Sequence, residues 1–295
     1  MAPLYRKKIA VISNPVSGNE VKRRILYPVI EELKNKGIEI EHFVSERPNG
    51  AGEFVSTIIN SKFDAVAVAG GDGTICEVAN ALIGSNIPMA LIPTGTINLL
   101  AKELGLTRDA EDLAKTIAKG PVRQIFPCYA GNRLFLVLAS VGFDANVVND
   151  VSLSLKYKLG LWAYVLSFIT RWLTSPCSPM EIEINGEERT VSGIVVANGR
   201  YYAGPFYIVK NASVFVPNFH LCLFSGTSRW SLLTLFATIV LGKANVLHKL
   251  EVILSSSLTV VGPPGLPVQV DGDVVGRTPI TITRSEENLH LIVPV

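Results

Sequence analysis

Up to about residue 120, short hydrophobic runs alternate with stretches whose apolar residues recur at helical spacing. The runs predict strands at KKIAVISNP (7–15), IEIEHFVS (38–45), DAVAVAG (64–70) and IPMALIP (87–93). The stretches between and after them predict helices over residues 20–36, 51–60, 74–83, 97–104 and 108–119. Near-continuous apolar strands that alternate with helices are typical of a parallel sheet covered on both faces. The pattern therefore predicts a doubly wound parallel-sheet α/β domain, with its chemistry at the carboxyl ends of the strands.

From about residue 123 the pattern changes to short strands of alternating polarity, which predict a mainly antiparallel β domain. These strands are expected within residues 133–139, 180–199, 220–226, 250–262, 266–275, 278–285 and 289–295. The Asn185-Gly186 pair predicts a hairpin turn, and two helices are expected within 153–173 and 231–241. We therefore expect an α/β domain over 1–122, a β-rich domain over 123–284, and a C-terminal strand over 285–295 that could pack back on the first domain.

Composition excludes several classes of protein. The net charge of +2, with no basic block longer than RKK or KRR, does not suit a nucleic-acid binder. Although 48% of the residues are hydrophobic, no run reaches the ~18–20 apolar residues of a transmembrane helix. Residues 159–174 are interrupted by Arg171, and residues 231–242 are too few. The start MAPLYRKK leaves no room for a signal-peptide core. Four scattered cysteines lack metal or disulfide spacing, so we expect a cytoplasmic protein with reduced thiols.

The segment GGDGTICEVANAL (70–82) follows a predicted strand and opens a predicted helix. Such a loop presents backbone N–H groups and the positive end of the helix dipole, which suits an anion such as phosphate. The P-loop pattern is absent from the chain, and the Rossmann spacing would need glycine where Cys76 stands. A tight turn in which Asp72 caps the helix is the alternative.

Two further strand ends carry polar, glycine-bearing loops, SNPVSGN (13–19) and PTGTINLLAKEL (93–104). The carboxyl ends of parallel strands meet at one edge of a sheet. Three such loops at one edge favour a nucleotide site over three unrelated turns.

The motifs NPVSG, GGDGTICEVANAL and PTGTIN, in this order, resemble those of the diacylglycerol kinase catalytic domain family, which includes bacterial soluble lipid kinases and the sphingosine kinases. The resemblance continues through FLVLASVGFDANVV (135–148), KYKLGLWAYVL (156–166), NGRYYAGPFYIVKNA (198–212) and VQVDGDVV (268–275). NAD kinases share the glycine-aspartate-glycine loop but not the later motifs. The resemblance implies the same fold, an α/β nucleotide domain followed by a β-rich domain.

The resemblance also implies roles for individual residues. The residues expected around the nucleotide are Asn14, Ser17, Ser45, Gly70, Gly71, Asp72, Gly73, Thr74, Thr96 and Asp271. Members typically carry Asp-Gly-Glu near the C-terminus, where the Glu is regarded as the catalytic base. Here the triplet is Asp271-Gly272-Asp273, so Asp273 would be the base, with Asp72 as its rival. Without the resemblance, VQVDGDVV would be an ordinary Asp-Gly hairpin.

The chain departs from the family at positions where many members have aspartates. Leu99 follows Asn98 where members often have Asn-Asp, and Val216-Pro217 stands where many have Asp-Gly. No acidic residue occurs between Asp112 and Asp144. In bacterial relatives such aspartates are associated with a structural Mg²⁺ site, and Val and Leu cannot ligate Mg²⁺. We therefore expect no resident metal, and Mg²⁺ only as MgATP.

The segment LSLKYKLGLWAYVLSFITRWL (153–173) bears on the substrate. It combines aromatic residues with Lys156 and Lys158, a composition suited to a membrane interface. The alternative is a helix packed in the core of the protein.

Together these features predict an ATP-dependent lipid kinase that transfers the γ-phosphoryl group of MgATP to a lipid hydroxyl, of the diacylglycerol, phosphatidylglycerol or sphingoid type. Phosphoryl transfer needs positioning, a cation to offset phosphate charge, and a carboxylate to orient the attacking hydroxyl. Access to the lipid would be by peripheral association with a membrane. Two alternatives remain, a kinase of a soluble hydroxyl substrate such as a nucleotide, and a non-catalytic protein that binds nucleotide or lipid. The oligomeric state stays open.

Overall fold

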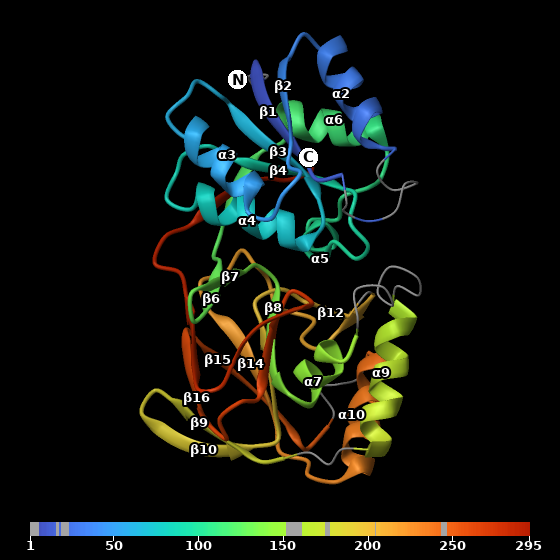
Figure 1. Ribbon diagram of the computed structural model, residues 1–295, viewed down its shortest axis with the longest axis vertical. Coiled ribbons are helices and arrows are strands. Elements are labelled where there is room, and N and C mark those ends of the chain that lie inside the picture. The colour runs from blue at the N-terminus through green and yellow to red at the C-terminus, as the bar shows by residue number, and fades with distance from the viewer. Residues whose placement is uncertain are drawn as a thin grey trace. The chain divides into compact units, whose positions relative to one another are not determined.

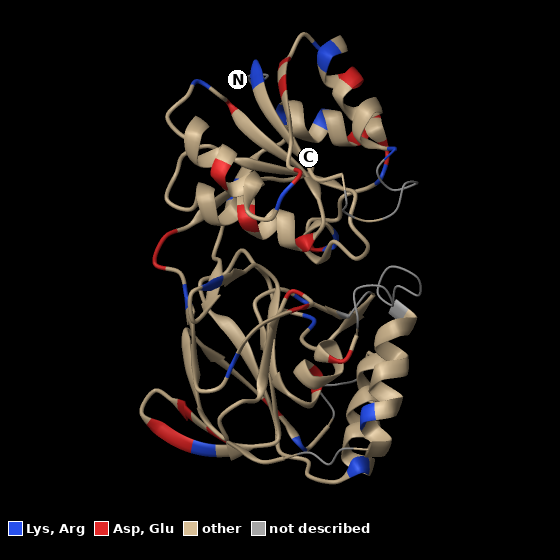
Figure 2. Ribbon diagram, in the orientation of Figure 1, with Lys and Arg blue, Asp and Glu red and all other residues tan. Residues whose placement is uncertain are grey.

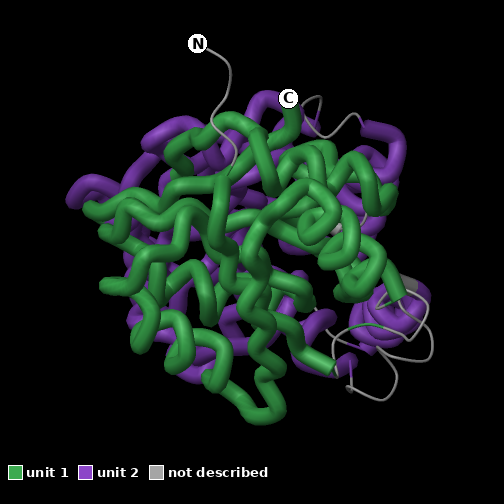
Figure 3. The backbone as a smooth tube through the Cα atoms, turned by 90° about the horizontal axis from the view of Figure 1, so that it is seen from above, with its two compact units in different colours: residues 1–125, 286–295 green, residues 126–285 purple. Residues whose placement is uncertain are grey.

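The computed structural model describes residues 6–15, 18, 24–151, 161–174, 178–203, 205–242 and 247–295. The chain divides into two compact units (Figures 1 and 3). The first unit comprises Met1–Ile125 and Glu286–Val295, and the second comprises Phe126–Ser285. The C-terminal segment therefore belongs to the same unit as the N-terminal half.

The first unit is built on a six-stranded sheet in the order β2-β1-β3-β4-β20-β5. β1 to β4 are parallel to their neighbours, β20 runs parallel to β4, and β5 is antiparallel to β20. The strands are β1 (Lys8–Ser13), β2 (Glu39–Val44), β3 (Ala65–Gly70), β4 (Met89–Pro93), β5 (Val122–Ile125) and β20 (Leu289–Ile292). This sheet confirms the predicted parallel α/β class.

Helices cover both faces of this sheet. They are α2 (Leu26–Asn35), α3 (Gly50–Ile58), α4 (Asp72–Leu82), α5 (Leu99–Glu103) and α6 (Ala110–Lys119). α2 packs beside α6, and α3 beside α4 (Figure 1). Every residue of β3 and β4 is buried, which explains why these strands are apolar without alternation. α2 begins at Leu26, and residues 20–23 of the helix predicted from residue 20 lie outside the described residues. α4 begins at Asp72 rather than Thr74.

The second unit contains two six-stranded sheets, in the orders β10-β9-β16-β19-β6-β7 and β15-β14-β11-β8-β17-β18. The strands of the first are β6 (Cys128–Ala130), β7 (Arg133–Phe135), β9 (Met180–Ile184), β10 (Glu187–Val191), β16 (Ser257–Gly262) and β19 (Ile280–Arg284). The strands of the second are β8 (Leu138–Gly142), β11 (Gly193–Ala197), β14 (Phe219–Phe224), β15 (Leu250–Ser255), β17 (Pro267–Val270) and β18 (Asp273–Arg277). Within each sheet, all neighbouring strands pair antiparallel, as predicted for this half of the chain.

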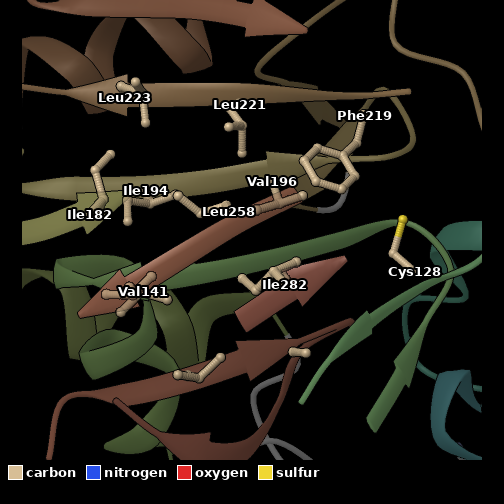
Figure 4. Packing of buried hydrophobic residues seen from close by; sticks show 14 of the residues in the cluster. Cys128, Val141, Ile182, Ile194, Val196, Phe219, Leu221, Leu223, Leu258 and Ile282 are labelled. Atoms are coloured by element: carbon tan, nitrogen blue, oxygen red, sulfur yellow. The ribbon is translucent and has the colours of Figure 1, made fainter. Parts of the chain in front are cut away.

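Alternate residues of both sheets form the core of this unit. Ile182, Leu258 and Ile282 of one sheet meet Val141, Val196, Phe219 and Leu221 of the other (Figure 4). The residues between them point to the opposite faces, as the two-residue period of a strand requires. The predicted hairpin is present, because Asn185 and Gly186 both have positive φ and link β9 to β10.

The outer face of the second sheet is covered by helices and by a small two-stranded ribbon. The helices are α7 (Phe143–Asn149), α9 (Leu161–Thr174) and α10 (Arg229–Val240), and the ribbon is β12 (Tyr201–Ala203) with β13 (Phe206–Tyr207). Val195, Ala197 and Cys222 of the sheet pack against this cover. α7 was not predicted, because seven residues are too few to show a helical period. No helix in the described ranges has the length and apolarity to cross a bilayer.

The expected strand RLFLVLA (133–139) is divided into β7 and β8. The amides of Leu136, Val137 and Leu138 donate to the carboxylate of Asp271, at 2.8, 3.0 and 2.9 Å. The side chain of Asn198 donates to the Leu136 carbonyl oxygen at 2.7 Å. The N–H groups between β7 and β8 are thus satisfied by a side chain, and the Val137 carbonyl oxygen accepts the backbone N–H groups of Asn198 and Gly199. The regular strand ladder is interrupted here.

We expect Asp271→Asn to lower the free energy of unfolding of the second unit by about 2–4 kcal/mol, because bonds to a charged acceptor are replaced by one amide oxygen and a repelling N–H group. Asparagine tolerates the left-handed conformation of this position, where φ is +46°, so the substitution tests the carboxylate and not the backbone. Chemical denaturation followed by tryptophan fluorescence measures it, since Trp162, Trp172 and Trp230 all lie in the second unit.

Asp273→Asn is the matched control. Asp273 lies in the same turn but is exposed, so its substitution should change the unfolding free energy by less than about 0.5 kcal/mol. Equal unfolding curves for the two variants would contradict the structural role of Asp271.

Candidate functional site

In the first unit, the loops that follow β1, β3 and β4 touch one another. The Asn14 side chain donates to Thr74 Oγ1 at 3.0 Å. A Cβ on Gly18 would lie 2.0 Å from the Thr94 carbonyl oxygen, and one on Gly95 would lie 2.6 Å from Gly71 Cα. Gly18 also has a φ of +66°, which favours glycine. The three glycine-bearing loops therefore form one continuous edge, and their glycines permit the close approach.

Asp72 fastens two of these loops together. Its carboxylate oxygens accept the backbone N–H groups of Asn98 and Leu99, at 3.1 and 2.8 Å. Leu99 is the first residue of α5, whereas the residue that caps α4 is Gly71, with no side-chain hydrogen bond. The alternative that Asp72 caps its own helix is therefore wrong, because the carboxylate caps the next helix instead.

The same edge holds buried polar atoms that are not used within the protein. Thr94 Oγ1 and Asn98 Oδ1 have no hydrogen-bond partner in the described part of the chain, although both residues are almost fully buried. The other end of the Asn98 amide donates to the Gly70 carbonyl oxygen at 2.9 Å, which fixes its orientation. Unused buried polar atoms beside the first turn of α4 offer hydrogen bonds to a ligand or to ordered water. Both residues belong to the predicted loop PTGTINLLAKEL, but neither is among the residues that the sequence predicted around the nucleotide.

The remaining residues predicted to bind nucleotide lie in varied surroundings. Ser45 is buried at the end of β2, where its N–H donates to the Ser13 carbonyl oxygen at 2.7 Å and its hydroxyl donates to the Arg47 carbonyl oxygen at 3.2 Å. Gly73 is exposed and Thr96 half-buried. Ser17 lies outside the described residues.

Lys102 of α5 adds a positive charge to this region. Burial lowers the pKa of its ammonium group, the Asp72 carboxylate opposes that shift, and Arg108 reinforces it. The ammonium group is therefore held in the field of both residues. The sequence signal that could have found Lys102 is its position one helical turn after Asn98.

In the second unit, Asp271 and Asp273 have different surroundings. Asp271 and Gly272 form a two-residue loop between β17 and β18, and both have positive φ. The turn is thus the Asp-Gly hairpin that the sequence left open. The carboxylate of Asp271 is turned to the backbone of residues 136–138, whereas Asp273 begins β18 as an exposed residue. Asp273 is therefore the carboxylate of this triplet that is open to solvent.

Beside this turn lies a largely buried polar cluster that the sequence did not predict, in which Ser140 and Gln269 are buried and Asp144 and Tyr202 half-buried. Asp144 accepts hydrogen bonds from the hydroxyls of Ser140 and Tyr202, and from the amide of Gln269 at 3.4 Å. Burial raises the pKa of the Asp144 carboxyl, and these three donors reduce the shift. Burial and the adjacent negative charge also raise the pKa of Tyr202. The signal that could have found this cluster is a charged residue and a glutamine within apolar segments.

Within the described ranges, no group of three or more His, Cys, Asp and Glu side chains gathers as a metal site would require. Val216 is partly exposed and carries no oxygen ligand in its side chain. Asp72 is the carboxylate beside the three loops, and a carboxylate with phosphate oxygens is the ordinary setting for Mg²⁺. Asp72 and the three loops thus fit a cation that arrives with a nucleotide. The expected absence of a resident metal stays a prediction.

Comparisons with known proteins cover nearly the whole chain. The family described as "Diacylglycerol kinase catalytic domain" matches residues 8–129, and the "YegS C-terminal NAD kinase beta sandwich-like domain" matches residues 137–293. A diacylglycerol kinase of Mycobacterium tuberculosis is 28% identical, over 97% of this chain and 95% of its own length. A diacylglycerol kinase of Bacillus subtilis is 30% identical, over 64% of this chain and 63% of its own.

Solved structures show the same fold. A candidate diacylglycerol kinase from Bacillus anthracis superposes with a TM-score of 0.82 at 21% identity, over 98% of this chain and 95% of that one. A diacylglycerol kinase from the same species gives a TM-score of 0.72 at 18% identity, over 98% of this chain and 97% of that one. The two domain matches account for both units of the fold, as the resemblance predicted. The chain belongs to the diacylglycerol kinase catalytic domain family.

Proposed function

We propose that the protein is an ATP-dependent lipid kinase that transfers the γ-phosphoryl group of MgATP to a lipid hydroxyl. The observation that carries the proposal is the edge of three joined loops in the first unit, with its unused buried polar atoms, in a chain of this family. Its first unit would hold the nucleotide, and its second unit would place the acceptor.

The nucleotide part of the proposal rests on the first turn of α4. The backbone N–H groups of Gly73 and Thr74 lie where a helix has no internal acceptors for them, and the helix dipole favours negative charge there. Thr96 of the neighbouring loop and Lys102 would add a hydroxyl and a positive charge. Mg²⁺ arriving with ATP would offset charge on the β- and γ-phosphates, with Asp72 as the nearby carboxylate.

Asp273 is the better candidate for the catalytic base, and Asp72 for a positioning residue. A carboxylate that accepts backbone N–H groups is stabilised in its charged form and is a weaker base. Asp72 accepts two such groups and Asp271 accepts three, whereas Asp273 lies exposed at the start of β18. Asp273 would orient the acceptor hydroxyl and take its proton late in the transfer.

The lipid part of the proposal rests on the exposed apolar faces of α9 and α10. The two helices pack together through stacked Phe168 and Phe236, whose ring centroids are 4.4 Å apart. Their outer sides nevertheless leave Trp162 at 72% and Trp230 at 71% of full exposure. Neither helix contains an acidic residue, and Figure 2 shows them almost without charge. Amphipathic indole rings on an acid-free apolar surface suit the interface of a bilayer. Lys156 and Lys158, also expected at this surface, lie outside the described residues.

We expect Asp273→Asn to lower kcat by at least ~100-fold while the KM for ATP changes little, because the general base is lost and the nucleotide contacts remain. The assay is transfer of radiolabelled phosphate from ATP to diacylglycerol, phosphatidylglycerol, sphingoid bases or ceramide in mixed micelles. Glu188→Gln, an exposed carboxylate of β10, is the matched control and should keep full activity.

The same assay separates the other interpretations. Labelled product from a water-soluble hydroxyl compound, without detergent or vesicles, would replace the lipid by a soluble acceptor. No labelled product from any acceptor would refute the kinase.

Asp72→Asn should act mainly through the nucleotide. The amides of Asn98 and Leu99 would lose their charged acceptor, so the loop that carries Thr96 would be held less firmly against α4. We expect the KM for ATP to rise by about tenfold or more, which corresponds to one lost charge-assisted hydrogen bond. Isothermal titration with a non-hydrolysable ATP analogue measures the effect without turnover, and unchanged binding would contradict the positioning role.

Replacement of Trp162 and Trp230 by serine should weaken binding to vesicles of phosphatidylcholine and phosphatidylglycerol by at least about tenfold, since each ring buries ~150–250 Å² on insertion. Co-sedimentation with the vesicles measures this. Tyr27→Ser is the matched control, because Tyr27 is 69% exposed but lies on α2 of the first unit. Equal binding by the double variant and the wild type would show that these helices do not meet the bilayer.

A further inference from the structure

The polar cluster around Asp144 lies on the outer face of the second sheet, where the proposed function does not use it. Its members come from separate elements, Ser140 from β8, Asp144 from α7, Tyr202 from β12 and Gln269 from β17. Val268 and Val270 point into the core, so Gln269 between them points to the outer face. Gln269 is 2% exposed and is the member that also contacts the turn carrying Asp273.

Both ends of the Gln269 amide are engaged. Its Nε2 donates to Ser140 Oγ at 3.0 Å and to Asp144 Oδ2 at 3.4 Å. Its Oε1 accepts the backbone N–H of Gly272 at 2.9 Å. The chemistry fixes this orientation, because a backbone N–H can only donate and the atom facing it must be the oxygen. A buried amide satisfied at both ends is a rigid link.

This link completes the anchoring of the turn. Asp271 is fixed by the backbone amides of residues 136–138, and Gly272 is fixed by Gln269. Both residues have positive φ, so the turn cannot relax into the conformations that most residues prefer. Asp273 follows directly, and the direction of its carboxylate depends on how Gly272 is held.

We propose that Gln269 is a positioning residue for the transfer reaction, which fastens the turn of residues 271–273 to the Asp144 cluster and so sets the direction of the Asp273 carboxylate. The expected effect on turnover rests on the proposed function. The hydrogen bonds of Gln269 to Ser140, Asp144 and Gly272 do not depend on that function. A displacement of about 1 Å in a catalytic group can cost on the order of 100-fold in rate.

The elements packed around the cluster add few ionisable groups. α7 contributes Asp144 and packs against β17, β18 and α9. The Tyr164 hydroxyl of α9 lies 3.9 Å from the place where a Cβ of Gly272 would stand. Among the described residues, the ionisable groups around the link are therefore Asp144, Tyr202, Cys222, Tyr164 and the two aspartates of the turn.

The first test is Gln269→Leu, which removes both ends of the link. We expect kcat to fall by about tenfold or more, with the KM for ATP unchanged because the nucleotide loops lie in the other unit. Gln124→Leu, on exposed β5, is the matched control and should leave kcat unchanged. A kcat for Gln269→Leu within about twofold of wild type would overturn the proposal.

The second test is Gln269→Glu, which keeps an oxygen for Gly272 but places a carboxyl group against Asp144. Two adjacent carboxyl groups hold one proton between them at low pH and repel each other once it is lost. We therefore expect kcat near wild type at about pH 6, falling toward the Gln269→Leu value by about pH 8. A pH profile identical to that of the wild type would overturn the coupling to Asp144, and a merely structural role of Gln269 would not produce this reversible profile.

Hydrogen exchange of the peptide spanning residues 268–275 tests the link without turnover. The Gly272 amide should exchange slowly in the wild type, and at the same pH at least about tenfold faster in Gln269→Leu. If the amide responds but no acceptor is phosphorylated, the link holds and the proposed function fails. If Asp273→Asn abolishes transfer while Gln269→Leu changes neither exchange nor kcat, the proposed function holds and this inference fails.

Discussion

The hydrogen bonds between the Asp271 carboxylate and the backbone amides of residues 136–138 constrain much of the second unit. They end β7, start β8 and hold the β17–β18 turn against this break in the strand. Because the Asp271 side chain is turned to the backbone, the next carboxylate of the triplet, Asp273, begins its strand exposed. The fold therefore turns one of two neighbouring aspartates to the backbone, while the other is exposed to solvent.

The first unit uses the same device. Asp72 accepts the amides of Asn98 and Leu99 and so joins the loops after β3 and β4. In both units a carboxylate satisfies backbone N–H groups that a ladder or helix cannot reach, which buried backbone requires. Family motifs rich in Asp and Gly thus combine two functions. Glycine allows loops to approach closely, and aspartate fastens them, so the presence of an aspartate in such a motif does not make it a catalytic base.

The regular elements could be predicted from the sequence because their signals are local. The fully buried runs of β3 and β4 and the Asn185-Gly186 hairpin are examples, and the fold class followed from them. The hydrogen-bond partners of the two aspartates could not be predicted, because they lie far away in the sequence. Those of Asp72 are 26 and 27 residues away, and those of Asp271 are 133 to 135 residues away. The cluster around Asp144 was missed for the same reason. No single member has a distinctive sequence signal, because the cluster is defined by hydrogen bonds between residues that are far apart in the chain.

The packing of the second unit connects the surface that we propose to meet the lipid with the turn that we propose to carry the catalytic base. α9 is fastened to α7 by the Ser167 hydroxyl, which donates to the Val147 carbonyl oxygen at 2.7 Å, and by the ion pair of Arg171 with Asp150. α7 in turn carries Asp144 and packs on β17 and β18. The exposed indoles and the turn of Asp273 therefore belong to one packed body. In the proposed function, the depth at which a lipid hydroxyl meets this carboxylate would be set by packing within one unit. Specificity for the acceptor would then depend on the helices rather than on the loops of the first unit.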